Sequence, residues 1–334
     1  MTIDESGVLV IGGGVIGLTS AIALAESGRR VRLITRDAVG GTTSAVAGGL
    51  CWPYRVQPYA RAVRWSVRSY EVLAALAERP AETGARMVTG TMTAEVADGT
   101  AGPPAADDGL AAWYEAVPEL RRARPDELPE GGASGWRART PLVDMPAHLR
   151  YLERRFAAAG GVVERRPVTS LAEAGREAGT VVNCSGLGAR DLVPDPGVYP
   201  VQGQLVIVEN PGVEEWFVSA APGAAETTYV LPQPYGVVLG GTACEHAWSR
   251  EPDPAVAVAI VARCARRFPA LARARVLAHR VGLRPARSEV RLAAERLPGG
   301  ALCVHNYGHG GAGVTVAWGC ADDVVRLIAE ADAA

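Results

Sequence analysis

The chain has 334 residues, a length typical of one large domain or two smaller ones, and it buries enough surface to form a core without disulfides or metals. Apolar residues make up 48% and charged residues 21%, as in ordinary globular proteins. The net charge is −2, so we do not expect nucleic acid as a partner. All 34 basic residues are arginines, which excludes Schiff-base chemistry and a phosphate-loop lysine.

Targeting, redox and metal signals are weak. The first residues, MTIDESG, are acidic where a secretory signal is basic, so we expect a cytoplasmic protein. The apolar segment 8–25 contains four glycines, which favours strand, turn and helix over a membrane span. The histidines show no metal-binding spacing, and we expect no metal site. Six widely spaced cysteines are expected to be small buried apolar residues: Cys51, Cys184, Cys244, Cys264, Cys303 and Cys320.

The hydrophobic pattern predicts a βαβ unit at the start of the chain, with strands at 8–11 and 31–34 around a helix that ends near 27. The remaining predicted elements are a helix over 59–79, a surface loop over the low-complexity stretch 97–109, a helix over 148–159, strands at 162–164 and 181–184, a strand-rich region over 196–247, a helix over 254–268, a strand at 302–305 and a closing helix from 313.

The α/β and antiparallel patterns alternate along the chain, which predicts two domains built from discontinuous segments. The expected fold class is α/β plus α+β. A Rossmann-like domain would comprise residues 1–50, 139–195 and 284–334. A mixed-sheet domain would comprise residues 51–138 and 196–283.

A glycine-rich turn joins the first strand to the first helix. Gly12-x-Gly14-x-x-Gly17 lies in the context that the dinucleotide fingerprint requires. The glycines allow a tight turn and close approach of a pyrophosphate to the helix N-terminus. The second strand is followed by Arg36-Asp37, whereas the fingerprint usually places an acidic residue at the first of these positions. Arg36 alone would therefore also admit NADP.

Two further segments favour flavin dinucleotide over a nicotinamide cofactor. Residues 42–50 form a run of small and hydroxyl residues that can lie along an extended cofactor. Residues 305–315, HNYGHGGAGVT, form a second glycine-rich turn between a strand and a helix. A second helix terminus beside a flavin ring would stabilise the negative charge of its reduced state.

These motifs together resemble the D-amino-acid oxidase family of FAD enzymes, and most closely its actinobacterial members. The resemblance runs over about residues 8–325 and rests on five segments in the family's order: GGGVIGL, TTSAVAGGL, VVNCSGLGAR, GLRP and HNYGHGGAGVTVAWG. It implies a non-covalently bound FAD. The cofactor-binding residues that it implies are Gly12, Gly13, Gly14, Val15, Ile16, Arg36, Asp37, Thr43, Ser44, Gly48, Gly49, Leu50, Val168, Ser185, Arg284, Gly310, Gly311, Ala312, Gly313, Val314 and Thr315.

The resemblance also implies a reaction and three residues that perform it. Arg284 would bind the substrate carboxylate, Tyr229 would reach the same carboxylate, and the Gly311 carbonyl would accept from the substrate amine. A D-amino acid would then transfer hydride from its α-carbon to the flavin, and O₂ would reoxidise the flavin. The products would be a 2-oxo acid, ammonia and hydrogen peroxide. His309 needs no acid–base role in this scheme. A homodimer is suggested by the resemblance alone.

The chain departs from the family near the substrate. Ala225 replaces the second tyrosine that animal members carry on a lid, and Cys51-Trp52 replaces the usual Trp-Gln. Ala243 stands where D-aspartate oxidases carry an arginine. We therefore expect neutral D-amino acids, including bulky ones, as substrates. The alternatives are a D-aspartate oxidase, a glycine or sarcosine oxidase, an NADP reductase and a flavin-binding protein without catalysis.

Overall fold

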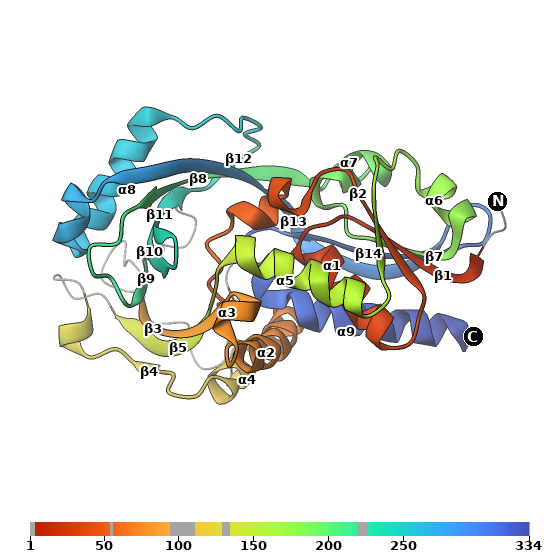
Figure 1. Cartoon of the computed structure of the whole chain (residues 1–334), viewed down its shortest axis with the longest axis horizontal. Helices are drawn as coiled ribbons and strands as arrows, with labels where there is room; N and C mark the ends of the chain where they lie inside the picture. Colours follow the sequence, from red (N-terminus) through yellow and green to blue (C-terminus); the bar gives the residue numbers. More distant parts are fainter. Residues whose placement is uncertain (1–3, 54–55, 94–110, 129–133, 220–225, 334) are drawn as a thin grey trace.

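A computed structural model describes residues 4–53, 56–93, 111–128, 134–219 and 226–333 (Figure 1). The predicted loop over 97–109 and the lid position Ala225 lie outside these residues. Both chain termini lie at one end of the elongated molecule, at the right of Figure 1. The opposite end carries helix α8 (Pro254–Arg267).

One half of the molecule contains a parallel sheet with the strand order β14-β7-β1-β2-β6. Its strands are β1 (Asp4–Ile11), β2 (Val31–Thr35), β6 (Val162–Arg165), β7 (Ala178–Asn183) and β14 (Leu302–His309). Alternate residues of β1, β2, β7 and β14 face two separate apolar clusters, one on each side of the sheet. The buried stretch 8–11 of β1 is therefore apolar throughout, as expected for a strand covered on both faces.

Helices cover both faces of this parallel sheet. The first cluster contains residues of α1 (Val15–Glu26), α2 (Tyr59–Leu76), α5 (Met145–Ala158) and α9 (Gly313–Asp332). The second cluster contains residues of α6 (Leu171–Glu177). Helix α1 is buried on most sides because it contacts both α5 and α9 as well as the sheet.

The other half is mainly antiparallel. Its sheet order is β4-β5-β3-β9-β10-β11-β8-β13, in which only β3 and β9 run parallel. The strands are β3 (Ala85–Thr93), β4 (Arg121–Arg122), β5 (Gly135–Val143), β8 (Tyr199–Val208), β9 (Trp216–Ser219), β10 (Glu226–Gln233), β11 (Gly236–Thr242) and β12 (Cys244–Glu245), which pairs with β8. Helix α8 covers this sheet through a separate cluster. The other α-helices in the described ranges are short: α3 (Pro80–Thr83), α4 (Ala111–Ala116) and α7 (Ala189–Leu192).

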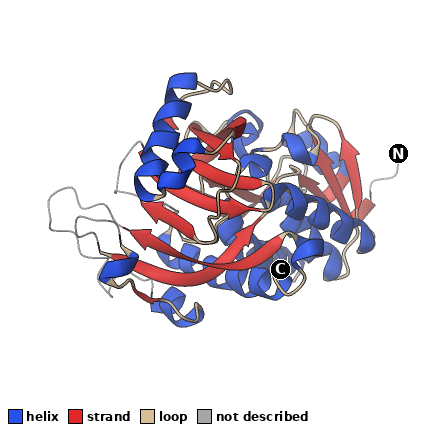
Figure 2. Cartoon of the chain, turned by 60° about the vertical axis from the view of Figure 1, so that its left-hand side comes forward, coloured by secondary structure: helices blue, strands red, loops and turns tan. Residues whose placement is uncertain are grey.

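Strand β13 (Val276–Arg296) joins the two halves into one sheet. Its first part, to Ala286, pairs with β8, and its second part, from Ala286, pairs with β14. Figure 2 shows the strands continuing from one half to the other. Because β13 crosses the boundary expected at 283/284 without a break, the halves share this element; the division into two domains stays a prediction.

The fold class predicted from the sequence is confirmed, and the predicted helices and strands at 8–34, 59–79, 148–164, 254–268 and 302–313 appear within a few residues of the expected positions. One cysteine prediction is wrong, because the side chain of Cys244 is exposed. Cys244 lies in the two-residue strand β12, which pairs only with β8 and has no layer packed over this residue. The other five cysteines are buried.

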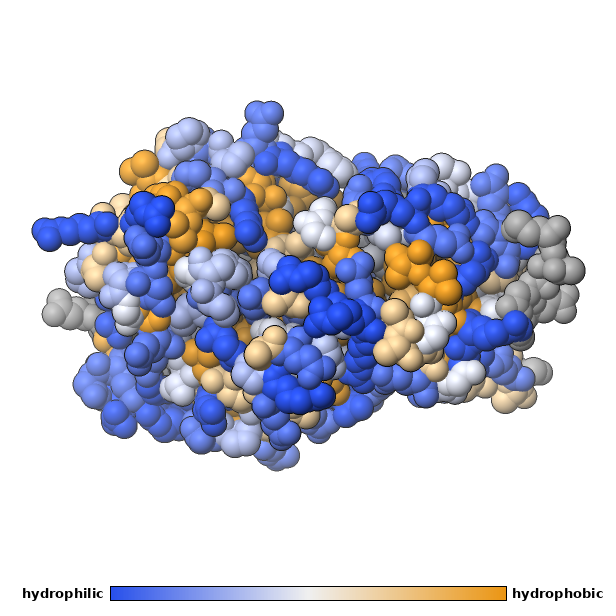
Figure 3. Space-filling view, in the orientation of Figure 1, coloured by the Kyte–Doolittle hydropathy of each residue, from blue (hydrophilic) through white to orange (hydrophobic). Residues whose placement is uncertain are grey.

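The face of the molecule in Figure 3 is mostly polar and carries separate apolar patches. The larger patch lies at the upper left, in the antiparallel half that contains α8. Val258 of α8 is 71% exposed. Within the described ranges, no helix combines the length and apolarity needed to cross a membrane. Over the same residues, no three or more His, Cys, Asp or Glu side chains are grouped as a metal site would need.

Candidate active site

A cavity of about 790 Å³ lies between the parallel and the antiparallel halves. It is lined by both glycine-rich turns and by residues of β8, β10 and β13. Every site residue predicted from the sequence lines this cavity except Ala312, which is buried with an exposure of only 2%. The structure therefore brings together segments that are up to 300 positions apart in the chain.

The first glycine turn leaves open backbone at the cavity wall. Gly12 has φ +115°, and a Cβ there would lie 2.3 Å from the Cys184 carbonyl oxygen. A Cβ on Gly13 would lie 2.6 Å from Thr35 Oγ1. Gly14 is the N-cap of α1 and offers no side-chain cap, so most of the first N–H groups of this helix lack a capping partner. Such an end attracts a phosphate group.

The second glycine turn repeats this arrangement. Helix α9 begins at Gly313, after an N-cap, Ala312, that makes no side-chain hydrogen bond. Thr315 Oγ1 donates to the Trp52 carbonyl at 3.1 Å and accepts from the Trp52 N–H at 3.2 Å. By contrast, helices α5 and α8 begin with Asp144 and Asp253, whose carboxylates accept from the first turn. The two long helices that start at the cavity thus keep their N-termini open.

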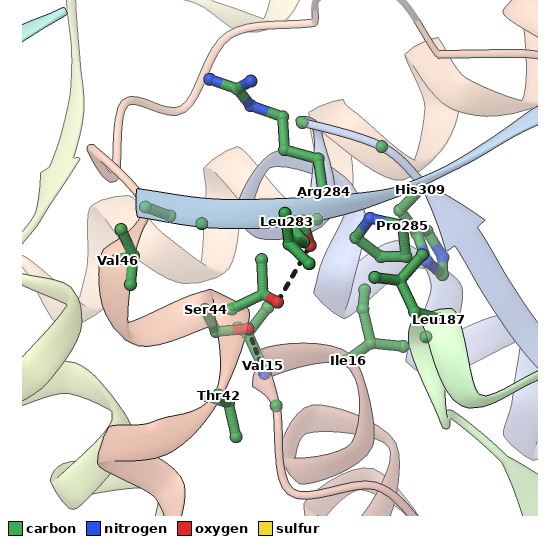
Figure 4. Close-up of a pocket in the computed structure, with 18 of the residues that line it drawn as sticks. Val15, Ile16, Thr42, Ser44, Val46, Leu187, Leu283, Arg284, Pro285 and His309 are labelled. Atoms are coloured by element: carbon green, nitrogen blue, oxygen red, sulfur yellow. Dashed lines mark hydrogen bonds between the residues drawn. The ribbon is translucent and has the colours of Figure 1, made fainter. Parts of the chain in front are cut away.

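The small-residue segment 42–50 connects the first turn to strand β13. Thr43 Oγ1 donates to the Leu283 carbonyl at 3.0 Å, and Ser44 Oγ accepts from the Val15 N–H at 3.0 Å (Figure 4). Gly49 has φ +82°, and a Cβ there would lie 1.9 Å from the Val143 carbonyl oxygen. Only glycine fits this backbone, so the segment can lie flat against the cavity.

The far end of the cavity contains Arg36, Asp37 and Val168. Arg36 donates to the Asp37 carboxylate at 2.8 and 3.0 Å. This hydrogen bond holds the pKa of Asp37 below its usual value, and desolvation opposes that shift. Because Asp37 already neutralises Arg36, the arginine is a weak candidate for a 2′-phosphate. Ser185 Oγ, also at the cavity, is buried without a hydrogen-bond partner among the described residues. An extended dinucleotide would supply one.

The other end of the cavity is built from side chains. Arg284 extends from β13 on the side opposite to Val15 and Ser44 (Figure 4). Its Nη1 donates to the Thr242 carbonyl at 2.9 Å, and its guanidinium lies so close to Gly203 that a Cβ there would be 2.4 Å from Nη1. A Cβ on Gly311 would lie 3.4 Å from Arg284 Cδ, so the second glycine turn borders the same guanidinium.

Tyr229 faces this guanidinium from β10. Its ring packs on Gly240 and Gly241, where a Cβ would lie 1.7 Å from Cζ and 2.7 Å from the hydroxyl. Burial raises the pKa of Tyr229, and the nearby positive charge of Arg284 opposes that shift. The hydroxyl therefore stays protonated near neutral pH and can donate a hydrogen bond.

The wall beside Arg284 and Tyr229 is apolar and includes Leu50, Trp52, Met92, Val218 and Leu231. Leu50 was predicted as a cofactor-binding residue, whereas sequence reasoning missed Met92, Val218 and Leu231. Met92 and Val218 sit in strands β3 and β9, which carry no motif. Strand pairing brings them to the site, because Val218 pairs with Tyr229 and Met92 pairs with Val218, and no local sequence pattern encodes that pairing.

His309 lines the cavity as a neutral imidazole. It is buried, and Nε2 lies 3.1 Å from Asn306 Oδ1. Burial lowers its pKa to about 3. The imidazole is therefore neutral at physiological pH, and its contact with Asn306 is structural.

Fold and site together define a FAD-dependent oxidoreductase. The family model described as "FAD dependent oxidoreductase" matches residues 7–327. Two curated relatives named D-amino-acid oxidase are 58% identical (Streptomyces coelicolor; 96% of this chain and 96% of the relative) and 49% identical (Rubrobacter xylanophilus; 96% and 94%). Human D-aspartate oxidase is 32% identical over 98% of this chain and 96% of that protein. The chain therefore belongs to the D-amino-acid oxidase family, and its cofactor is FAD.

Solved structures agree in fold. Glycine oxidase from Bacillus cereus superposes with a TM-score of 0.77 at 19% identity, covering 98% of this chain and 96% of that one. Glycine oxidase from Geobacillus kaustophilus gives the same TM-score of 0.77 at 20% identity, covering 97% and 94%. At these identities the likeness concerns the fold alone.

Proposed function

We propose that this chain oxidises neutral D-amino acids to 2-oxo acids, ammonia and hydrogen peroxide. The observation that carries the proposal is the convergence of Arg284, Tyr229 and Gly311 at one end of a cavity whose other end fits FAD. The names of the relatives at 58% and 49% identity support the same activity.

Arg284 and Tyr229 position the substrate. The Arg284 guanidinium is always charged and presents paired N–H groups that match a carboxylate. The protonated Tyr229 hydroxyl donates to the same carboxylate. The Gly311 carbonyl, next to Arg284, accepts from the substrate amine. These contacts hold the α-carbon in one orientation, and orientation is a major source of rate in such reactions.

FAD, when bound, supplies the acceptor for the hydride that leaves the α-carbon, and O₂ takes up the electrons as hydrogen peroxide. The chain holds the cofactor through the uncapped N-termini of α1 and α9 and through segment 42–50. We assign the adenosine end to Arg36, Asp37, Val168 and Ser185, and the flavin end to the turn from Gly310 to Thr315.

The preference for neutral substrates follows from the charges around the cavity. Ala243 lines the cavity where D-aspartate oxidases carry an arginine, and Glu245 lines it as well. Besides Arg284, the arginines at the cavity act on carboxylates of the protein: Arg287 pairs with Asp195, Arg166 pairs with Glu164 and Glu177, and Arg36 and Arg250 act on Asp37 at the far end. A carboxylate that loses its hydration without a counter-charge is strongly disfavoured. The apolar wall formed by Leu50, Met92 and Leu231 instead favours apolar side chains.

The test is peroxide formation by the full-length protein with D-valine, D-methionine, D-aspartate, D-glutamate, glycine, sarcosine and L-valine at one pH. We expect kcat/KM to be highest for the neutral D-amino acids and L-valine to be inactive. Equal or higher values for D-aspartate would instead identify a D-aspartate oxidase, and highest values for glycine or sarcosine would identify an amine oxidase. Absence of peroxide with all substrates, in a protein that still contains flavin, would reject oxidase activity.

A cytoplasmic role in D-amino-acid catabolism and a homodimeric state are parts of the same proposal. They rest on the sequence and on the family. Sedimentation of the holoenzyme at several concentrations tests this state, because a dimer should sediment with twice the 34.8 kDa mass of one chain.

A further inference from the structure

A chain of hydrogen bonds runs beneath the cofactor cavity, on the α6 side of the parallel sheet. It starts at the Glu295 carboxylate on β13, whose Oε1 lies 2.9 Å from His305 Nε2 on β14. His305 Nδ1 lies 3.2 Å from Asn183 Nδ2 on β7. Asn183 Oδ1 accepts from the Ser185 N–H at 3.2 Å. His305 and Asn183 are both fully buried.

The Ser185 N–H fixes the positions of all the other hydrogens in this hydrogen-bond network. The Ser185 backbone N–H can only donate, so the Asn183 amide must point its oxygen toward Ser185 and its NH₂ group toward His305. His305 Nδ1 must then accept. The imidazole proton therefore sits on Nε2 and is donated to Glu295. This hydrogen-bond network requires a neutral His305 with its proton on Nε2.

The hydrogen-bond network ends at the loop of Cys184 and Ser185, which forms part of the cofactor cavity. The Cys184 N–H donates to the Ile11 carbonyl at 2.8 Å, and the Cys184 carbonyl lies against Gly12 of the first glycine turn. Ser185 follows, with its buried and unpartnered Oγ at the cavity. A shift of Ser185 would thus displace both a polar contact to the cofactor and the turn that receives its pyrophosphate.

We propose that His305 is a positioning residue for FAD, and that its protonation weakens FAD binding. A proton on Nδ1 would face the Asn183 NH₂ group, which is also a donor. Asn183 would relieve this conflict by rotating its amide, and its oxygen would then leave the Ser185 N–H. Binding of FAD and protonation of His305 therefore oppose each other, so affinity falls as the pH falls.

The charges around His305 are compatible with this role. Burial lowers the pKa of His305, and Arg291 of β13 acts in the same direction. The carboxylates of Glu295 on the same strand and Asp195 in the loop after α7 oppose the shift. Two other titratable side chains of β14 contact His305: Cys303 Sγ lies 3.8 Å from Nε2, and the Tyr307 ring lies edge-on at 5.6 Å between centroids. Burial raises the pKa of each to about 12, so both stay neutral. The neutral imidazole is thus the ordinary state, and protonation is confined to pH values below 6.5.

The experiment measures release of FAD from diluted full-length holoenzyme by the recovery of flavin fluorescence, over a pH series in which circular dichroism shows the protein folded. We expect the FAD dissociation constant of the wild type to rise roughly two- to twelvefold toward the acid end of this series, as the loss of about one hydrogen bond would produce. His305→Gln keeps one acceptor and one donor but cannot titrate. It should bind FAD about as the wild type does near neutral pH and show a flatter pH profile.

His305→Leu removes both contacts and should raise the dissociation constant roughly tenfold at neutral pH. The matched control is His148→Leu, because His148 is equally buried but bonds the Thr83 carbonyl away from the cavity. It should reduce stability without changing FAD affinity. If His305→Leu does not fold, Glu295→Ala gives the same test from a residue whose side chain is 45% exposed.

Identical pH profiles of wild type and His305→Gln would overturn the protonation step. An unchanged FAD affinity in His305→Leu or Glu295→Ala, or an equal loss in His148→Leu, would overturn the positioning role. The inference rests on the FAD site of the proposed function, but its readout is FAD affinity. An inactive protein that still binds flavin with this pH dependence would therefore refute the proposed substrate and leave the inference standing.

Discussion

The two ends of the cavity use different parts of the polypeptide. The cofactor end is made largely of backbone: two glycine-rich turns and the uncapped N-termini of α1 and α9. The substrate end is made of side chains, chiefly Arg284 and Tyr229, which project from antiparallel strands. Backbone recognition depends on the conformation of a continuous segment, whereas side-chain recognition depends on strands that meet only in the folded protein. Substitutions at one end should therefore change FAD affinity, and substitutions at the other end should change kcat/KM.

Arg284→Ala should produce the largest effect, and only at the substrate end. Removing one partner of a buried charge pair costs about 2–5 kcal/mol, so kcat/KM should fall roughly 30-fold to several-thousand-fold. Arg284→Lys keeps the charge but loses the paired N–H groups, and should fall between the two. Steady-state kinetics with D-valine measure the effect, and the 450 nm flavin absorbance monitors the cofactor. Wild-type turnover in Arg284→Ala would remove Arg284 from carboxylate binding.

Gly12→Ala should produce the next largest effect, at the cofactor end. The new Cβ would meet the Cys184 carbonyl at 2.3 Å, in a residue with φ +115°. The first turn must shift, and we expect the FAD dissociation constant to rise at least about tenfold. The matched control is Gly28→Ala, because Gly28 has φ +91° but nothing within 4 Å of a Cβ. That variant should lose about 1–2 kcal/mol of stability and bind FAD normally. Equal FAD affinities in the two variants would contradict the role given to the first turn.

The difference between backbone and side-chain recognition also explains which parts of the site could be predicted from the sequence. The cofactor end was predictable because Gly12, Gly14 and Gly17 lie within one short segment, and the second turn lies within another. The predicted cofactor residues line the cavity apart from Ala312, the buried N-cap residue of α9. Arg284 and Tyr229 were singled out only through the family resemblance, since a lone arginine among 34 carries no local signal.

Strand β13 was the main element that the sequence did not reveal. Its 21 residues include Pro285, and a proline inside a strand normally argues against a central position. The structure resolves this conflict, because Pro285 lies where β13 changes its partner from β8 to β14. A proline lacks a backbone N–H, and it is tolerated at such a transition. The contact between Arg284 and Gly203 likewise depends on a strand pairing that no local pattern encodes.

Tyr229→Phe should produce a smaller effect at the substrate end. The loss of one neutral hydroxyl donor costs about 0.5–1.5 kcal/mol, so kcat/KM should fall roughly two- to twelvefold. Because burial raises the pKa of Tyr229 above its ordinary value of 10.0, the hydroxyl stays protonated up to at least that pH. Wild type and Tyr229→Phe should therefore have parallel kcat/KM profiles up to pH 10. An alkaline decrease below pH 10 that is present in the wild type and absent in Tyr229→Phe would contradict this assignment.

Asp253→Ala should produce the smallest effect and leave both ends of the cavity unchanged. The Asp253 carboxylate accepts from the N–H groups of Ala255 and Val256 and caps α8, which covers the antiparallel sheet away from the cofactor. Its loss should cost about 1 kcal/mol of unfolding free energy and, in a chain of this length, lower Tm by roughly 1–2 °C. Asp253→Asn retains the capping oxygen and should restore Tm. FAD affinity and kcat/KM should match the wild type in both variants. A loss of FAD in Asp253→Ala would show that a capped helix also acts on the cofactor, and the distinction between capped and open helix ends would then fail.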